Sequence, residues 1–338
     1  MCCSREMGAY LRFFKSRTRL ELACYSTTVD NQIVTVRVSP AAGMILQTRN
    51  EGSVENYGIE ATLAQDIFKT KDFEWTATAN FSLNRGKVKS LPDQIQQIDG
   101  TNYGGIYPTS FLGGSSTGIT GKDYVRDPNG NVVCDENGYP LIDTSKQLYI
   151  GNREPDFMLG VGSNFRWKDV TVGFLFDGRC GGDVVNITGS SLISNGQHHL
   201  YDKYRNREVV WNGVVATGVD ANGNTIYEPN KTAIILDQTN INKYLYTVSS
   251  NFIEDGSYIR LSYVTVGYDL KKLLSKNCPV KGLNVSLTGR NLFLLTKYSG
   301  SDPQVQESGS SNGSGTGGFD RYGVPNTRSF NLSVKATF

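Results

Sequence analysis

Two adjacent histidines, His198 and His199, are the only histidines in the chain and the first candidates for metal ligands. Neighbouring residues of a strand point to opposite faces, so on a strand the two imidazoles could not bind one ion. Six cysteines are spread without the close pairs that a zinc site would use. They are Cys2, Cys3, Cys24, Cys134, Cys180 and Cys278. The sequence therefore predicts neither a metal site nor a disulfide framework.

Carboxylates offer the next possible chemistry. Glu254 and Asp255, or Asp302, could act as an acid–base pair in hydrolysis. No spacing in the sequence places them opposite one another, and surface turns are rich in carboxylates. The glycine-rich run 309–318 lacks the Gly-Lys-Ser/Thr of a phosphate-binding loop. We expect no catalytic residue, no cofactor and no enzymatic activity.

The segment from Asp127 to Asn131 has some similarity to a calcium-binding loop. Such a loop needs a bidentate glutamate at its twelfth position, which here is Gly138. Asn-Gly pairs are the strongest short signal for a hairpin turn, and they occur in 127–133, 135–140 and 220–227. We therefore expect three hairpin turns inside long loops. The low-complexity run 308–318 is typical of a mobile surface tip.

Aromatic side chains are frequent between the predicted strands. Aromatic faces suit the apolar C–H patches of a glycan, so these residues could bind sugar rings. They could equally pack the loops against one another, and both alternatives remain open. They are Tyr103, Tyr107, Phe111, Tyr124, Tyr139, Tyr201, Tyr204 and Trp211.

The elements that would position these residues are strands, and the clearest is 73–84. Its odd-numbered residues, from Phe73 to Leu83, are apolar, whereas the even-numbered ones, from Glu74 to Asn84, are polar. Alternation over twelve residues predicts a strand with one apolar and one polar face. An ordinary strand has about 5 or 6 residues, whereas a tilted membrane-spanning strand needs about 9 to 11.

Similar segments recur, and nine candidate strands result. Strong ones are 157–167, 170–176, 257–270, 283–288 and the final 330–338, and weaker ones are 5–14, 18–34 and 54–66. A change of face near Val264 suggests a β-bulge. The connections alternate between short ones, 15–17, 67–71, 168–169 and roughly 271–282, and long ones, roughly 35–53, 85–152, 181–255 and 297–325. In an antiparallel meander all long loops then emerge at one end, as in a bacterial outer-membrane barrel.

Composition narrows the class further. With 34 basic and 32 acidic residues there is no electrostatic case for binding nucleic acid. No apolar run approaches the roughly 18 residues of a membrane-spanning helix, but a barrel strand shows lipid only at every second residue. We predict an all-β fold, a partial antiparallel transmembrane β-barrel. Alternatives are a soluble β-sandwich adhesin or carbohydrate-binding protein, and, less favoured, a passive porin or an autotransporter barrel.

Several long motifs resemble one family, the SusC/RagA-type TonB-linked outer-membrane transporters. They include NFIEDGSYIRLSYVTVGYDL (251–270), GRNLFLLTKYSGSDPQV (289–305), the hairpin 151–184, and the strands 55–63 and 325–338. Together the resemblance covers nearly the whole chain in the family's order. It implies a barrel of roughly 22 strands, blocked by an N-terminal plug, that imports glycans or oligopeptides across the outer membrane of Bacteroidetes-type bacteria. The implied partners are a SusD-like surface lipoprotein, TonB acting through the plug, and membrane lipid.

The sequence differs from this family in the number of strands that it contains. Nine strands cannot close such a barrel, and open strand edges in lipid cost several kcal/mol per unpaired backbone group. The start of the chain has no apolar segment of a secretory signal. We expect residues 1–338 to be the C-terminal portion of the barrel, a truncated product or fragment without the plug and earlier strands.

The last strand carries the one functional signal that we assign to residues. Its alternating apolar side chains end on a terminal aromatic, an arrangement that resembles the signal read by the barrel-assembly machinery. The residues are Phe330, Leu332, Val334, Ala336 and Phe338. They would act by strand addition, because an exposed edge offers free N–H and C=O groups. The plainer alternative is that they simply form the last strand.

Overall fold

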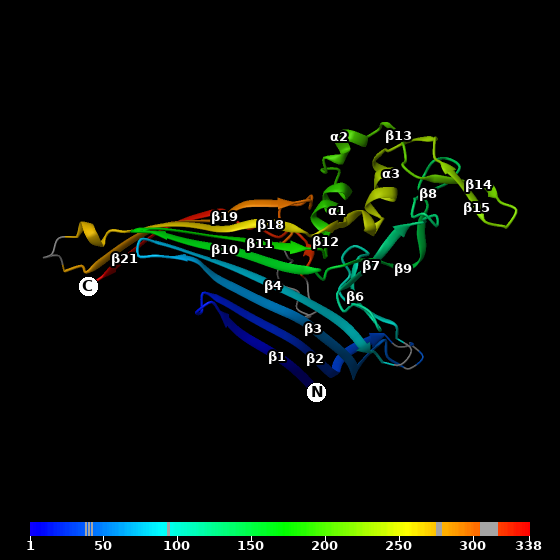
Figure 1. The fold of residues 1–338 in the computed structure, drawn as a ribbon. Helices are drawn as coiled ribbons and strands as arrows, with labels where there is room; N and C mark the ends of the chain where they lie inside the picture. Colours follow the sequence, from blue (N-terminus) through cyan, green and yellow to red (C-terminus); the bar gives the residue numbers. More distant parts are fainter. Residues whose placement is uncertain (38, 40, 42, 93–94, 275–278, 305–316) are drawn as a thin grey trace.

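The computed structural model describes residues 1–338 except 38, 40, 42, 93–94, 275–278 and 305–316. Nine long strands form one antiparallel sheet, which confirms the predicted strand number and order. Figure 1 shows them side by side, with the N-terminus at the end from which the long loops emerge and the C-terminus at the opposite end. The strands are β1 (Cys2–Phe13), β2 (Thr18–Arg37), β3 (Leu46–Lys69), β4 (Phe73–Ser90), β10 (Phe157–Trp167), β11 (Val170–Cys180), β18 (Tyr258–Asp269), β19 (Gly282–Thr296) and β21 (Ser329–Thr337).

The pairing register aligns the predicted faces of neighbouring strands. Ala79 of β4 lies opposite Leu63 of β3 and Val161 of β10, and the alternation continues through the sheet. Because side chains alternate between faces with a period of two, a slip by one residue would mix polar and apolar residues. The observed register instead gives one mainly apolar face, interrupted at Gln65 and Ser163, and one mainly polar face.

One detail of the predicted strands is wrong and another is confirmed. The connection expected over 35–53 is mostly strand, because β2 and β3 continue as a ladder to the pair Arg37 and Leu46. Its residues favour this outcome, since the run from Ile33 to Val36 is rich in β-branched side chains. The bulge predicted near Val264 occurs at Ser262, where the pairing of β18 with both neighbours skips one residue.

Apart from the 3-10 helix η4 (Lys271–Leu273) at the short-turn end, the remaining elements form a unit at the long-loop end, which we call the loop body (Figure 1). It contains two groups of elements and a returning strand. The first group lies between β4 and β10 and comprises β5 (Gln97–Asp99), β6 (Tyr107–Phe111), β7 (Gly118–Tyr124), β8 (Val133–Cys134) and β9 (Ile142–Asn152). The second lies between β11 and β18 and comprises β12 (Asp183–Asn186), α1 (Ile187–Ser194), α2 (Leu200–Tyr204), β13 (Glu208–Val210), β14 (Val214–Val219), β15 (Thr225–Pro229), β16 (Ala233–Ile235), α3 (Gln238–Ile241), η2 (Asn242–Tyr246), η3 (Ser249–Phe252) and β17 (Ile253–Asp255). The returning strand is β20 (Phe319–Asp320). None of the helices in the described part of the chain is long and apolar enough to cross a membrane.

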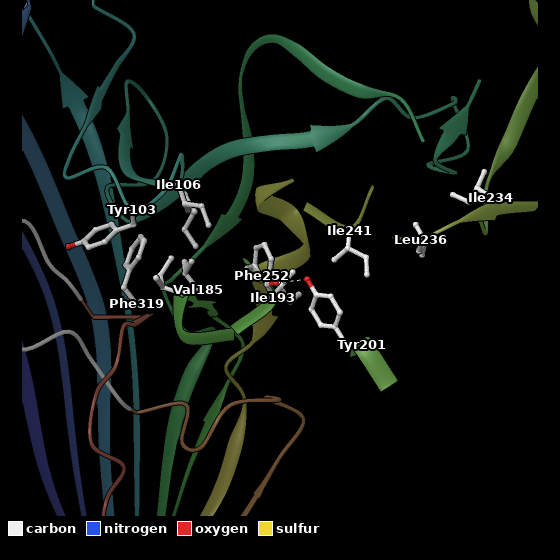
Figure 2. Packing of buried hydrophobic residues seen from close by; sticks show 12 residues of the cluster. Tyr103, Ile106, Val185, Ile193, Tyr201, Ile234, Leu236, Ile241, Phe252 and Phe319 are labelled. Carbon is white, nitrogen blue, oxygen red and sulfur yellow. Dashed lines mark hydrogen bonds between the residues drawn. The ribbon is translucent and has the colours of Figure 1, made fainter. Parts of the chain in front are cut away.

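The hydrophobic core of the protein lies in the loop body and not in the long sheet. Figure 2 shows residues from the first loop, such as Tyr103, packed with Val185 and Phe252 of the second and with Phe319 of the last. Ile119, Val185 and Phe319 are fully buried. Three segments far apart in the sequence therefore fold as one packed unit.

Shortening one side chain of this core should loosen the loop body measurably. We expect Ile119→Val to cost about 0.5–1.5 kcal/mol, since it leaves a small cavity in a fully buried site. The increase in the rate of limited proteolysis within the loop body would measure this. Ile226→Val, at a largely exposed residue of β15, is the matched control and should have no such effect. Equal rates for both variants would contradict the shared core.

Candidate functional site

The apolar face of the long sheet is open to the surroundings. Large side chains from eight of the nine strands, all but β4, project from it and are each more than a third exposed. They include Met7, Leu22, Leu63, Phe157, Leu159, Val161, Phe176, Ile259, Leu287, Phe293 and Leu332. Soluble proteins rarely expose a contiguous apolar patch larger than a few hundred Å². A soluble sandwich would cover this face, whereas its extent here suits contact with lipid.

Near the short turns the apolar face carries a row of aromatic rings. Trp75 stacks on Phe68 with ring centroids 6.0 Å apart and on Phe165 at 5.3 Å, and Phe174 follows at 6.2 Å from Phe165. These residues come from β3, β4, β10 and β11. Aromatic girdles of this kind mark the membrane–water interface of outer-membrane barrels.

The opposite, polar face is lined by hydroxyl, amide and charged groups. Its side chains bond to one another across strands, for example Thr265 with Thr288 at 2.9 Å between hydroxyl oxygens. The Tyr25 hydroxyl donates to Asn84 Oδ1 at 2.9 Å, bridging from β2 over β3 to β4. Such a face can line a water-filled path, because a polar solute finds hydrogen-bond partners along it.

A cavity of about 590 Å³ lies where the polar face meets the loop body, and we call it the mouth cavity. Asn84 and Arg179 line it from the sheet, Thr109 from the loop body, and Arg153 and Glu154 from the connection between β9 and β10. Its walls are therefore built jointly by strands and loops. Any solute entering the polar face from the long-loop end would meet these residues.

The connection 153–156 is fixed to β4 by several hydrogen bonds. Glu154 Oε1 accepts from the Gly86 backbone N–H at 2.7 Å, and Arg85 donates to the Pro155 carbonyl at 2.7 Å. Burial raises the pKa of Glu154 above its ordinary value, while the Gly86 bond acts in the opposite direction. Gly86 itself allows a close approach, since a Cβ there would lie 2.3 Å from Ser116 Oγ.

Two guanidinium groups give the mouth cavity positive charge. Arg153 donates to the carbonyls of Thr117 at 3.3 Å and Gly317 at 2.9 Å, and lies 5.4 Å from the Phe319 ring centroid. Burial lowers its pKa to about 10, so it remains charged at neutral pH. Arg179 in turn donates to the Arg153 carbonyl at 2.8 Å. The arrangement can hydrogen-bond polar groups of a solute, and it presents no paired acid and base.

A buried ion pair ties the last long loop to the sheet. Arg260 Nη2 of β18 lies 2.6 Å from Asp302 Oδ1, and both side chains are more than nine-tenths buried. Asp302 also accepts from the Gln304 backbone at 2.9 Å and from Asn326 at 3.0 Å. Burial alone would raise the pKa of Asp302, but the bond from Arg260 and these donors hold it below the ordinary value. The pair anchors the loop at the mouth.

The loop aromatics mostly pack the loops together. Tyr103, Tyr124 and Tyr201 are buried, and the Tyr124 hydroxyl donates to the Tyr244 carbonyl at 2.6 Å. Tyr139, Tyr204 and Trp211 lie against the same core. Phe111 contacts Tyr149, and the Tyr107 hydroxyl accepts from Asn102. Of the two alternatives left open by the sequence, the structure favours packing.

The histidine pair lies in the long connection 181–255 and not on a strand. His198 and His199 precede the short helix α2, and their ring centroids are 4.2 Å apart. Burial, and then the neighbouring His199, lower the pKa of His198. Within the described residues, no group of three or more histidine, cysteine or acidic side chains could hold a metal ion.

The acidic candidates are engaged separately in local contacts. Glu254 accepts from Ser299 and from Asn186, at 2.6–2.8 Å. Asp255 accepts from the backbone N–H and hydroxyl of Ser257, and Asp302 belongs to the ion pair with Arg260. The structure does not bring these carboxylates together as a hydrolytic pair.

The three Asn-Gly segments are hairpin turns, as predicted. In each, an aspartate at the first position accepts backbone N–H bonds from the third and fifth residues, all at 2.7–2.9 Å; these aspartates are Asp127, Asp135 and Asp220. Each aspartate is therefore engaged within its own turn. The low-complexity prediction for 308–318 falls mainly on 305–316, outside the described residues.

The C-terminal strand β21 lies at one edge of the sheet, paired only with β19. The side chains of Phe330, Leu332, Val334 and Phe338 are 60–75% exposed, and Ala336 alternates with them. Strand β1 forms the other edge. The role of these residues as an assembly signal stays a prediction, for which the exposed edge supplies the required backbone groups.

Comparison with known proteins identifies relatives over almost the entire chain. Residues 4–292 match a family model described as TonB dependent receptor-like, beta-barrel. TonB-dependent receptor P3 of Formosa agariphila is 25% identical over 98% of this chain and 34% of its own length. TonB-dependent receptor SusC of Bacteroides thetaiotaomicron is 23% identical over 98% of this chain and 31% of its length.

The solved structures agree on the fold. The RagAB peptide importer in its open-open state superposes with a TM-score of 0.71 at 18% identity, covering 100% of this chain and 34% of that one. The chain thus spans about a third of the length of the relatives that it matches. The nine-stranded sheet and its loop body correspond to a portion of a larger barrel.

Proposed function

Because the chain belongs to the family of TonB-dependent receptor-like β-barrels of the bacterial outer membrane, we propose that it forms nine wall strands of a SusC/RagA-type importer. The cargo would be a large nutrient, an oligopeptide or a glycan. The observation that carries the proposal is the register, which gives the sheet one face for lipid and one for water. The polar groups of the mouth cavity would meet the cargo as it enters.

The unpaired edges of β1 and β21 support a role within a larger barrel. In lipid an open edge costs several kcal/mol per unsatisfied backbone group, so further strands must pair with both edges. The matched relatives are about three times as long as this chain, which leaves room for further strands and a plug. We propose that residues 1–338 form the C-terminal portion of the barrel, and that β21, with Phe330 to Phe338, is recognised by the barrel-assembly machinery.

The proposed partners follow from this placement. TonB would act through the plug, from the end at which the short turns lie. A SusD-like lipoprotein would cover the opposite end, where the loop body presents its surface, as RagA pairs with RagB in the RagAB importer. We propose import with no covalent chemistry of the chain's own, because the charged groups of the mouth cavity are held by backbone carbonyls and amides.

Dependence on TonB tests the proposed function. A strain lacking the full-length receptor should lose growth on one class among peptides and oligosaccharides offered as sole nutrients. Complementation with the full-length gene should restore growth, and depletion of TonB should abolish it again. Growth that persists without TonB would contradict active import and would favour a passive pore.

A further inference from the structure

The short turns of the sheet form a cross-linked rim, which we call the short-turn rim; it comprises residues 14–17, 70–72, 168–169 and 269–273. Arg17 of the first turn donates to the Ile67 carbonyl at 2.7 Å, beside the second turn. The Lys168 backbone N–H donates to the Asp72 carbonyl at 2.7 Å, and the Asp269 N–H to the Asp169 carbonyl at 2.8 Å. The turns are therefore held as one surface and not as separate flexible tips.

This rim carries excess positive charge. Its cationic residues are Lys15, Arg17, Lys71, Lys168, Lys271 and Lys272, and its acidic residues are Asp72, Asp169 and Asp269. Asp169 Oδ2 forms an ion pair with Lys272 Nζ at 2.6 Å, and the Asp269 carboxylate accepts a hydrogen bond from the Lys271 backbone N–H. Within the described part of the chain, Lys15, Lys71 and Lys168 form no ion pair although each is exposed. Three ammonium groups thus lack a carboxylate partner in this surface.

Exposed aromatic side chains stand next to these lysines on the apolar side. Trp167 is 61% exposed, and the Lys168 ammonium lies 5.8 Å from its ring centroid. Phe14, 78% exposed, precedes Lys15, and Phe68 lies just before the second turn. Tryptophan and phenylalanine beside lysine suit the boundary where acyl chains end and phosphate groups begin.

We propose that the short-turn rim binds the phosphate groups of anionic phospholipids, with Lys15, Lys71 and Lys168 as the ligating residues. The aromatic rings enter the edge of the apolar layer, while the ammonium groups reach the headgroup phosphates. The proposal rests on the barrel placing its short turns at a single membrane interface. It concerns lipid and not cargo, so its failure would leave the growth assay for import unaffected.

Lipid binding by the purified full-length receptor in detergent tests the proposal. The probe is phosphatidylglycerol, and the zwitterionic phosphatidylcholine serves for comparison. In Lys15→Gln/Lys71→Gln/Lys168→Gln we expect the apparent affinity for phosphatidylglycerol to fall at least about tenfold, given an attraction of about fivefold per lysine near an anionic surface. Rising salt should weaken binding in the parent and have little effect in the variant.

The matched control is Lys146→Gln/Lys203→Gln/Lys231→Gln, which removes the same charge from exposed residues of the loop body. Its affinity should stay within about twofold of the parent, because these lysines lie far from the rim. Equal losses in both variants would mean a general charge effect and would overturn the proposal, as would no loss in either. Displacement of bound phosphatidylglycerol by inorganic phosphate at the same concentration as the lipid would also overturn the proposal. Should the triple variant not fold, Lys168→Gln against Lys203→Gln makes the same comparison.

Discussion

Asp302→Ala should destabilise the full-length receptor by about 3–5 kcal/mol, because it leaves the Arg260 guanidinium buried without its partner. Arg260 Nε already has no hydrogen-bond acceptor among the described residues, and the contacts with Asn291 and the Tyr258 ring supply no negative charge in place of Asp302. The free energy of unfolding in urea, measured in lipid or detergent micelles, checks the value. The last long loop should also become accessible to protease.

Two further variants separate the buried charge from general disruption. Asp156→Ala removes the partner of Arg85 from an exposed pair 3.5 Å apart and should cost less than about 1 kcal/mol. The double variant Arg260→Met/Asp302→Leu should recover much of the stability lost in Asp302→Ala, since no buried charge remains. A double variant as unstable as Asp302→Ala would show that the ion pair is not the cause.

Ala79→Arg should cost about 2–4 kcal/mol in the folded full-length receptor, because it places a charge on the apolar face within the bilayer. Ala79 gives the clearest test of the apolar face, because both of its cross-strand neighbours, Leu63 and Val161, are apolar. Ala77, which sequence alternation alone would suggest equally, faces Gln65 and Ser163, and these polar groups could accommodate an arginine. The measurement is the urea midpoint of the barrel in phospholipid vesicles.

Thr78→Arg is the matched control on the polar face of the same strand. Thr78 lies opposite Gly162 and Ala64, so an arginine there has space and water. We expect a change below about 1 kcal/mol. Comparable costs for Ala79→Arg and Thr78→Arg would contradict the assignment of the two faces to lipid and water.

The strands and their faces could be predicted because a strand repeats every two residues, a pattern confined to neighbours in the sequence. Residues 73–84 illustrate this, since their alternation fixes the side of the sheet on which each side chain lies. The alternation of short and long connections was predicted for three of the four long ones, whereas most of 35–53 is strand. The hairpin turns followed from Asn-Gly pairs, which require only local geometry.

The loop body could not be predicted in the same way, because its contacts join residues far apart in the chain. The hydroxyl of Tyr124 bonds to a carbonyl 120 residues later, and Asp302 meets Arg260 across 42 residues. No periodic pattern encodes such pairs. Short apolar runs inside the loops, such as 184–185 and 233–236, did indicate a core there, because a loop that only connects two strands in solvent has no use for apolar residues. These runs supply fully or nearly fully buried residues of the core.

The common core of the loop body has a consequence for redesigning cargo choice. Grafting 85–152 from a related importer without 181–255 would juxtapose surfaces that evolved with different partners, since Tyr103 and Ile119 pack against Val185 and Phe252. Exchanging both segments together with the returning strand around Phe319 would preserve that fit. A chimera that exchanges all the segments of this core together is therefore the one expected to assemble.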